Sequence, residues 1–472
     1  MYYNIGFTKG VSPSLLKLED STYAVLNYGI DSITGQQNMG IFKIDKFGNL
    51  IVKKNYDLGY DYLYYNNGFR YFLNANNSSL FVTSGSYISN KLNLCLTKIN
   101  KQTLDTIKVT YFTDGLFNYY FSSTLKFNDN KFFLVGTKYD TNNLWPAIAE
   151  MDSNLVIKNI ITCANTQSLQ PISALINPVD KKLIMGGTKN EGLNYYGFIA
   201  KYDTLGNFID STVCRGPNLS GFKKIVYSAV DNSYIAIGGK KTSTYGNTSM
   251  HRFYICKFDH NLNIVWQKVI GKSNLSNYAQ NAIVNSDGSI LVVGLYSDSI
   301  TNPVINKNYN GGMLKLRANG DSLWMKQFDN FTGANNYFEG LYGIENSFDG
   351  GYIACGDIAY KPKSDAWVVK TDSLGCDTAT CLFSSGFNEI SNNNFALNVY
   401  PNPNSGSFNI EVTENDRVET EISLVNVLGI EIKRYRINSG SIKAENIPPG
   451  IYTLQLFSKG KQVIPKKIIV SD

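Results

Sequence analysis

The chain has 472 residues and a net charge of +6, with 44 basic and 38 acidic residues spread along its length. A pI near 8.6 is lower than a nucleic-acid-binding domain usually shows, and no run of 18 apolar residues is present, so the composition excludes a basic nucleic-acid footprint and a membrane-spanning helix. Only 17% of residues are charged, whereas 32 Tyr and 26 Phe favour half-buried strands. We therefore expect an all-β protein of at least two domains.

A short phrase recurs along the first 380 residues: an apolar strand, a lysine, an acidic residue two positions later, and a turn. FKIDKFGN (42–49), AKYDTLGN (200–207) and VKTDSLG (369–375) are clear copies. A period of more than 50 residues is typical of a repeat architecture. The acidic position falls at Asp45, Asn100, Asp152, Asp203, Asp259, Arg317 and Asp372, so seven copies are present, two of them degenerate.

A second phrase alternates with the first and consists of a turn, four or five strand-forming residues and a glycine. Each unit therefore predicts four short strands, with tight turns between strands one and two and between strands three and four. A single four-stranded sheet cannot bury both faces, so consecutive units must stack around an axis. We predict a seven-bladed β-propeller of four-stranded blades over residues 1–380. The glycines that we assign to the second phrase are Gly85, Gly136, Gly186, Gly238, Gly294 and Gly356.

The last unit has no fourth strand after VKTDSLG, while the chain begins with YYNIG, which is similar to the fourth-strand ending QKVIG (267–271). We predict that the N-terminal segment completes the last blade, which removes an exposed sheet edge. The units resemble the degenerate propeller repeats of secreted bacterial proteins, on FDGGYIACG (348–356) and AWVVKTDSLG (366–375). That resemblance implies the fold and leaves the function open.

The connections of the other two kinds are longer, and we expect them to share one face of the ring. They are rich in Tyr, Asn, Ser and Gly, a mixture that binding loops favour, and a broad uncharged surface suits a glycan or a protein partner. The alternative is that the tyrosines cap the gaps between blades. The segments are 57–69, 113–120, 189–196, 240–249, 298–312 and 329–340, and the candidate ligand-binding residues are Tyr62, Tyr64, Tyr65, Tyr119, Tyr195 and Tyr337.

The sequence offers little for catalysis. His251 and His260 are the two histidines, and we interpret them as ordinary surface residues; the repeated aspartates suit turns, where Asp bonds its own backbone. NSDGSI (285–290) lacks the aromatic end of a sialidase box, and no metal, phosphate or other cofactor motif is present. We predict a non-enzymatic, monomeric binding or structural protein. The alternative is a secreted glycan-active hydrolase or lyase with its site on the long-loop face.

The sequence changes character near its end. Residues 381–394 are expected to form a polar linker, and residues 395–472 a small Ig-like antiparallel β-sandwich. Three motifs within this segment, in order, closely resemble the type A C-terminal sorting domain of the type IX secretion system. The matching residues are Pro401, Asn402, Pro403, Gly406 and Phe408; Gly429 at the end of VNVLG; Pro449, Gly450, Ile451 and Tyr452; and the basic pair Lys466 and Lys467.

The resemblance implies export across the outer membrane, removal of the domain by a sorting peptidase, and a secreted or cell-surface protein, anchored or released. Members of this family carry an N-terminal signal peptide, which Met1 to Gly10 does not resemble, so we expect the sequence to start downstream of the true start or after processing. Cys376 and Cys381 are close enough for a small disulfide, although two unpaired thiols fit equally well. The other five cysteines lie in strand-like runs as small hydrophobic residues.

Overall fold

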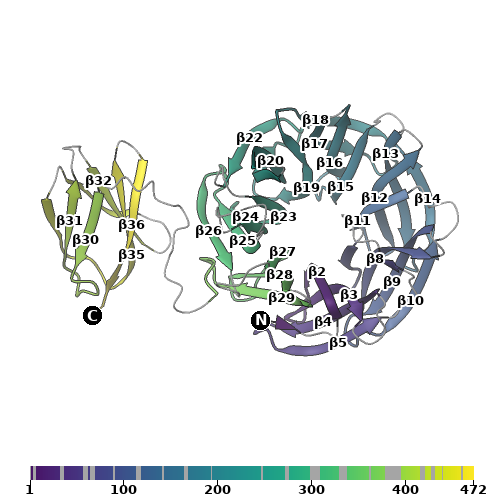
Figure 1. Cartoon of the computed structure of the whole chain (residues 1–472), viewed down its shortest axis with the longest axis horizontal. Coiled ribbons are helices and arrows are strands. Elements are labelled where there is room, and N and C mark those ends of the chain that lie inside the picture. The colour runs from purple at the N-terminus through teal and green to yellow at the C-terminus, as the bar shows by residue number, and fades with distance from the viewer. Residues whose placement is uncertain are drawn as a thin grey trace. The chain divides into compact units, whose positions relative to one another are not determined.

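A computed structural model shows the chain as strands joined by turns, with no helix in the described part, and divides it into two units, Met1–Ser384 and Ser385–Asp472 (Figure 1). The first unit is a ring of sheets and the second a sandwich. At some strand ends only the backbone is described. The described residues are 2–3, 7–31, 37–56, 62–63, 70–88, 91–112, 119–140, 143–163, 168–192, 194–245, 248–271, 276–297, 309–328, 337–360, 363–377, 395–414, 420–426, 431–437, 440–458 and 461–471.

The ring is built from consecutive antiparallel sets of strands, each beginning near the centre and ending at the rim (Figure 1). The first sets are β2 (Phe7–Lys17), β3 (Thr22–Asp31), β4 (Gln37–Asp45) and β5 (Leu50–Tyr56); β6 (Tyr62–Leu63) and β7 (Arg70–Asn74) with β8 (Ser79–Ile88), β9 (Lys91–Asn100) and β10 (Thr106–Phe112); and β11 (Tyr119–Lys126), β12 (Lys131–Asp140), β13 (Asn143–Asp152) and β14 (Ile157–Thr162).

The remaining sets continue in the same order. They are β15 (Leu169–Ile176), β16 (Leu183–Glu191), β17 (Asn194–Tyr202) and β18 (Phe208–Cys214); β19 (Leu219–Ser228), β20 (Ser233–Tyr245), β21 (Thr248–Phe258) and β22 (Ile264–Ile270); β23 (Asn277–Val284), β24 (Ile290–Ser297), β25 (Tyr309–Leu316) and β26 (Ser322–Phe328); and β27 (Tyr337–Asn346), β28 (Tyr352–Tyr360) and β29 (Lys363–Thr371). These repeated antiparallel sets, most of them four-stranded, are the arrangement predicted for a β-propeller.

The two ends of the ring meet through backbone pairing. β1 (Tyr2–Tyr3) pairs antiparallel with β29, Tyr2 opposite Trp367 and Tyr3 opposite Ala366, where the sequence analysis placed a closing strand. A parallel bridge joins β2 to β29, and another joins β25 to β27, so three of the sets share one continuous sheet. The hydrogen bonds therefore do not separate the ring into individual blades everywhere, and the number seven stays a prediction.

The middle strands of each set bury side chains on both faces. Leu183 and Met185 of β16 pack in the cluster toward β12 and β13, whereas Ile184 between them packs in the next cluster, toward β20 and β21. Two buried faces explain why these strands are continuous apolar runs rather than alternating ones. The cluster between the first and the last set contains Tyr23 and Phe42 together with Ile353 and Val368, so apolar packing closes the ring.

A β-bulge in the inner strand of most sets explains the glycine of the second phrase. In β11 the pairing with β12 shifts between Phe121 and Ser123, and the bulge carries the Tyr120 carbonyl oxygen to 1.9 Å from where a Cβ on Gly136 would lie. The same clash recurs at Gly294, Gly356 and Gly187, where an added Cβ would lie 1.6 to 2.0 Å from a carbonyl oxygen of the inner strand. Our assignment of Gly186 was therefore wrong by one residue, because the bulge that selects Gly187 leaves no sequence signal.

Replacing Gly294 with alanine is expected to destabilise the ring by about 3 kcal/mol, since the new Cβ meets the Tyr278 carbonyl oxygen at 1.9 Å and backbone must move. Gly312→Ala on the adjacent strand β25 is the control, because its first neighbour is the Tyr296 Cβ at 3.3 Å. Urea unfolding of both variants checks the prediction. Equal midpoints for the two variants would contradict the bulge explanation.

The lysine of the first phrase joins one set to the next. Lys257 Nζ lies 2.5 Å from Asp231 in the turn of its own set and donates to the Ala318 carbonyl oxygen, at 3.4 Å, in the turn of the following set. Lys201 donates in the same way to the His260 carbonyl oxygen at 2.7 Å. The aspartate of the phrase accepts hydrogen bonds from its own turn, as Asp203 does from the Leu205 and Asn207 amides.

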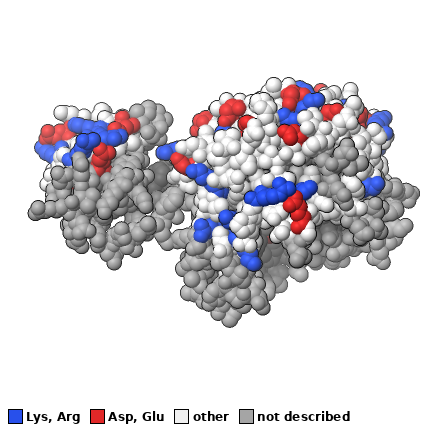
Figure 2. Space-filling model, turned by 90° about the horizontal axis from the view of Figure 1, so that it is seen from above, with Lys and Arg blue, Asp and Glu red and all other residues white. Residues whose placement is uncertain are grey.

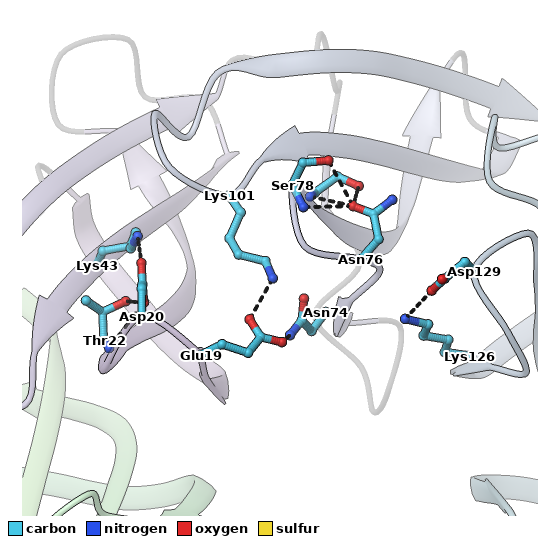
Figure 3. A network of polar contacts seen from close by, with 11 residues as sticks. Glu19, Asp20, Thr22, Lys43, Asn74, Asn76, Ser78, Lys101, Lys126 and Asp129 are labelled. Atoms are coloured by element: carbon cyan, nitrogen blue, oxygen red, sulfur yellow. Dashed lines mark hydrogen bonds and ion pairs between the residues drawn. The ribbon is translucent and has the colours of Figure 1, made fainter.

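Figure 3 shows this arrangement at the start of the ring, where Lys43 pairs with Asp20 at 2.9 Å. Beside this pair, Glu19 reaches the following set and accepts hydrogen bonds from Lys101 Nζ at 2.9 Å and Asn74 Nδ2 at 2.8 Å. Turns of the one-to-two and three-to-four kinds are thus fastened by paired charges. Figure 2 shows basic and acidic side chains interspersed among uncharged ones on the side of the ring in view.

The pairing makes stability depend on pH. Burial opposes the charged form of Asp231, but hydrogen bonds from Lys257, Ser233 and Ser228 outweigh it and hold the pKa of that carboxyl below its usual value near 4. A depressed folded-state pKa stabilises the fold above the unfolded-state pKa, and this stabilisation is lost as pH falls through the folded value. We expect Asp231→Asn to lower the melting temperature at pH 7, and we expect this difference to shrink as pH falls below the usual carboxyl pKa and through the lower folded-state value. Thermal melts from pH 7 to 2 test this; a constant difference across the range would contradict it.

The second unit is a two-sheet sandwich with its own core. One sheet has β30 (Phe395–Tyr400), β31 (Phe408–Glu414) and β34 (Gly440–Ala444), and the other has β33 (Glu431–Ile437), β32 (Thr420–Asn426), β35 (Gly450–Ser458) and β36 (Lys461–Val470). Phe408, Ile410, Leu424, Leu454 and Ile468 are buried together between the sheets. The predicted linker 381–394 lies outside the described residues.

Candidate functional site

Two of the segments predicted as long loops are paired strands. β16 and β17 continue to the pair Glu191 and Asn194, and β20 and β21 continue to the pair Tyr245 and Thr248. The prediction for 189–196 and 240–249 was wrong because Tyr, Thr and Asn suit an extended hairpin as well as a loop. Backbone pairing gives the side chains at these hairpins a more rigid base than a loop would.

The structure distinguishes two of the candidate tyrosines. Tyr195 lies near the tip of the β16–β17 hairpin and its side chain is 57% exposed. Tyr119 is half-buried, stacks 6.1 Å from Phe121, and packs against the core cluster between β8, β9 and β12, which matches the alternative that some tyrosines cap the packing. Only the backbone of Tyr62 and Tyr337 is described, and Tyr64 and Tyr65 lie outside the described residues.

Tyr195 borders a hollow of about 930 Å³ on the ring. Its walls come from the inner strands β15 and β19, the β16–β17 hairpin, the connection from β18 to β19, and β20 and β21. The lining residues are Gln170, Ile172, Thr188, Asn194, Tyr195, Tyr196, Gly216, Pro217, Asn218, Leu219, Ser220, Gly221, Lys223, Lys241 and His251. Size, aromatic rings and a few amide side chains are the usual features of a ligand pocket.

Polar contacts hold the walls of the hollow in place. Arg215 Nη2 lies 2.7 Å from Glu191 Oε1, and Arg215 Nε donates to Glu191 Oε2 at 3.3 Å, which joins the hairpin to the β18–β19 connection. Asn218, with a φ of 62°, accepts the Lys241 amide at 2.8 Å through its carbonyl oxygen. A bidentate guanidinium–carboxylate pair fixes orientation as well as distance.

The ionisable groups that line the hollow are basic. Lys223 occupies the bulge of β19, between Phe222 and Lys224, and Lys241 of β20 lies opposite His251 of β21. Burial lowers the pKa of His251, and the charge of Lys241 lowers it further. Burial also lowers the pKa of Lys223, although its side chain retains access to solvent. Lys223, Lys241 and Tyr196 were not predicted from the sequence, and His251 was interpreted as an ordinary surface residue, because no local pattern marks which side chains share a hollow.

The part of the chain with described coordinates contains no group of three His, Cys, Asp or Glu residues arranged to hold a metal ion. Within the same part, no helix has the length and hydropathy needed to cross a bilayer.

In the sandwich, the motif that begins at Pro401 holds the end of the last strand. Asn402 Oδ1 accepts the Ile469 amide at 2.8 Å, and the Asn404 amide donates to the Ile469 carbonyl oxygen at 3.0 Å. Asn404 in turn accepts the Ser471 amide at 2.8 Å through its own carbonyl oxygen. Two motifs that lie far apart in sequence therefore form one hydrogen-bonded unit.

Gly406, within the same motif, is hydrogen-bonded to the residue that precedes the PPG motif at 448–450. Gly406 has a φ of 93°, its amide donates to Asn404 Oδ1 at 2.9 Å, and its carbonyl oxygen accepts the Ile447 amide at 3.1 Å. Tyr452 Oη donates to the Pro448 carbonyl oxygen at 2.8 Å. Of the predicted motif residues, Phe408 and Tyr452 are buried in the core, and Gly450 and Lys466 are half-buried. The exposed ones are Pro401, Asn402, Pro403, Pro449 and Ile451. Lys467 is described by its backbone alone, and Gly429 lies outside the described residues.

Residues 398–471 match the family model of the secretion system C-terminal sorting domain. This segment is a type IX sorting domain. It marks the protein as one that is secreted and attached to the cell surface or the outer membrane, and it implies interaction with the type IX secretion machinery. The localisation predicted from the sequence is confirmed.

Known structures resemble the chain at low identity, and no curated protein matches it. An extracellular domain from B. thetaiotaomicron is 13% identical with a TM-score of 0.41; it covers 98% of this chain, which spans only 57% of that longer structure. The β-propeller domain of the Trilobed protease from Pyrococcus furiosus is 8% identical with a TM-score of 0.42, over 77% of this chain and 95% of that one. Sqt1 from Chaetomium thermophilum is 9% identical with a TM-score of 0.44, over 78% and 98%.

Cys376, at the end of the ring unit, is disulfide-bonded. Cys381, the partner that the sequence favours, lies outside the described residues, so the pairing of these two cysteines stays a prediction. Cys95, Cys163, Cys214, Cys256 and Cys355 are buried and are not disulfide-bonded.

Asn404→Ala is expected to destabilise the sorting domain by about 1–3 kcal/mol and to lower export, because the buried Asn404 side chain bonds Gly406 and Ile469. Asn409→Ala on β31 is the control, since it removes an asparagine outside this network. The exported fraction is measured by immunoblot of cell-surface and periplasmic fractions in a host with a type IX system. Export of the Asn404 variant at the wild-type level would show that the hydrogen bonds of Asn404 to Gly406 and Ile469 are not needed for export.

Proposed function

We propose that the propeller is a non-enzymatic carbohydrate-binding module displayed at the cell surface, with its ligand in the hollow beside Tyr195. The sorting domain delivers the protein outside the cell. There, soluble or surface glycans are abundant potential ligands. The ring supplies a stable scaffold, and the hollow supplies the binding groups.

The observation that carries the proposal is an exposed tyrosine held on a rigid hairpin beside amide side chains. Tyr195 and Tyr196 are successive residues of β17, paired with Asn190 and Lys189 of β16. A tyrosine ring offers an apolar face to the C–H groups of a sugar and a hydroxyl to its oxygens. Gln170, Asn194 and Asn218 line the same hollow with amide groups, which both donate and accept hydrogen bonds, as sugar hydroxyls do.

The residues that line the hollow favour binding over hydrolysis. Glycoside hydrolysis ordinarily uses two carboxylates on either side of the scissile bond. The described lining carries Lys223, Lys241 and His251 and no Asp or Glu, and the nearby Glu191 is engaged by Arg215. The alternative, a hydrolase or lyase, would need its acid and base elsewhere on the ring.

The test is a glycan array probed with the full chain and with Tyr195→Ala/Tyr196→Ala. We expect the wild type to bind a set of glycans and the double variant to lose at least about tenfold in affinity, because aromatic anchors dominate binding energy. Tyr111→Ala, which removes a 39% exposed tyrosine on the rim strand β10, should bind as the wild type does. Equal melting temperatures exclude unfolding as the cause.

Three results would overturn the proposal. The first is glycan binding that survives in Tyr195→Ala/Tyr196→Ala, and the second is no glycan binding by the wild type. The third is the appearance of new reducing ends or unsaturated sugars when the wild type is incubated with the glycans that it binds, which would make it an enzyme.

A further inference from the structure

We infer that the ligand of the hollow is an acidic saccharide, whose anionic group is held by Lys223 and Lys241. This inference rests on the proposed carbohydrate site and goes beyond it by naming the chemical class of the sugar. The anionic group is a carboxylate, as in a hexuronate, or a phosphate.

Three neighbouring strands of one sheet bring the basic groups together. Lys223 comes from β19, Lys241 from β20 and His251 from β21, and all three line the hollow. Lys223 is the extra residue of a bulge, a position that leaves the strand ladder and re-aims its side chain. Lys241 and His251 are directly opposite each other across the β20–β21 ladder. The sheet thus fixes both lysines on the same hollow.

The lysines of the hollow differ from the repeat lysines elsewhere in the ring. Lys43, Lys257 and Lys370 each pair with the aspartate of a turn, Asp20, Asp231 and Asp349 respectively. Among the described carboxylates, none forms an ion pair with Lys223 or Lys241. Glu191, at the edge of the hollow, gives both its oxygens to Arg215.

The hollow therefore carries positive charge that no described carboxylate neutralises in an ion pair. Burial lowers the pKa of His251, and the charge of Lys241 lowers it further, which agrees with a basic hollow. A lysine ammonium group is a compact point charge that binds a carboxylate or a phosphate without requiring planar, bidentate geometry. A sugar that stacks on Tyr195 and carries an acid group would fit both halves of the hollow, the aromatic one and the basic one.

The experiment compares acidic and neutral forms of the same sugar by calorimetry on the full chain. The first pair of probes is tetragalacturonate and its fully methyl-esterified form; the second is mannose 6-phosphate and mannose. We expect at least one acidic member to bind ten times or more tightly than its neutral partner. Which pair shows the difference identifies carboxylate or phosphate as the recognised group.

The variant Lys223→Gln/Lys241→Gln should abolish the preference for the acidic member, so that the acidic and neutral members bind with similar affinity. Lys240→Gln is the matched control, because Lys240 precedes Lys241 on β20 and is not part of the lining. Binding of the acidic member should also weaken as salt rises, as expected for a charge-based contact.

His251 gives a readout that does not depend on affinity. The chain has two histidines, so the ring signals of His251 and His260 are easily assigned by NMR with a His260→Gln variant. A bound anion should raise the pKa of His251 relative to the free protein and leave His260 unchanged. No change on saturation with an acidic sugar would overturn the placement of the anion.

The outcomes separate this inference from the proposed function. Equal binding of acidic and neutral sugars that is lost in Tyr195→Ala/Tyr196→Ala overturns the inference and keeps the carbohydrate site. Acid-selective binding that survives in Lys223→Gln/Lys241→Gln also overturns the inference. Binding of neither member of either pair overturns it, whereas acid-selective binding lost in both double variants supports both proposals.

Discussion

The structure depends on apolar packing between consecutive sheets. Every middle strand lies between two clusters, so neighbouring residues such as Leu183 and Ile184 point to different interfaces. Each sheet is stable only with a neighbour on both sides, which makes closure of the ring an energetic requirement. The cluster of Tyr23, Phe42 and Ile353 and the pairing of β1 with β29 meet that requirement at the same seam. With both faces of the strands committed, polar function is confined to strand ends, bulges and connections.

The connections of the ring do two different jobs. Antiparallel order places the one-to-two and three-to-four turns at one end of the strands and the other connections at the opposite end. At the first end, Lys257 and its equivalents fasten one set to the next through an aspartate and a backbone carbonyl. At the other end, the β16–β17 hairpin and the β18–β19 connection border a hollow whose lysines form no ion pair with a carboxylate in the described part of the chain. The same residue type is thus structural at one end and available to a ligand at the other.

Features encoded by contiguous residues could be predicted from the sequence, whereas features that depend on contacts between distant strands could not. The repeat phrase contains its own turn and strand, so the order of the sheets could be predicted, and so could the sorting domain, whose motifs are short and contiguous. Gly186 was chosen over Gly187 because the bulge depends on pairing between strands. The hollow could not be predicted at all, since Gln170, Asn218 and His251 come from β15, the β18–β19 connection and β21, which only the folded ring brings together. Tyr195 was found because exposed aromatic residues near a turn leave a compositional trace.

The bulge of the inner strand offers a physical reason why such a ring can acquire a ligand site without losing stability. The extra residue takes no part in the strand ladder, and in successive sets it is Ser122, Ile172, Lys223, Gln280 and Tyr342, side chains of unrelated chemistry. The residues beside it are constrained, as Phe121, Phe222 and Leu341 are fully buried. Lys223 is exposed at its bulge, so its charge does not disturb the packing between sheets, whereas the same charge at the preceding Phe222 would be buried. Lys223 occupies a position where the fold tolerates variation, and the hollow places it next to the hairpin tyrosines.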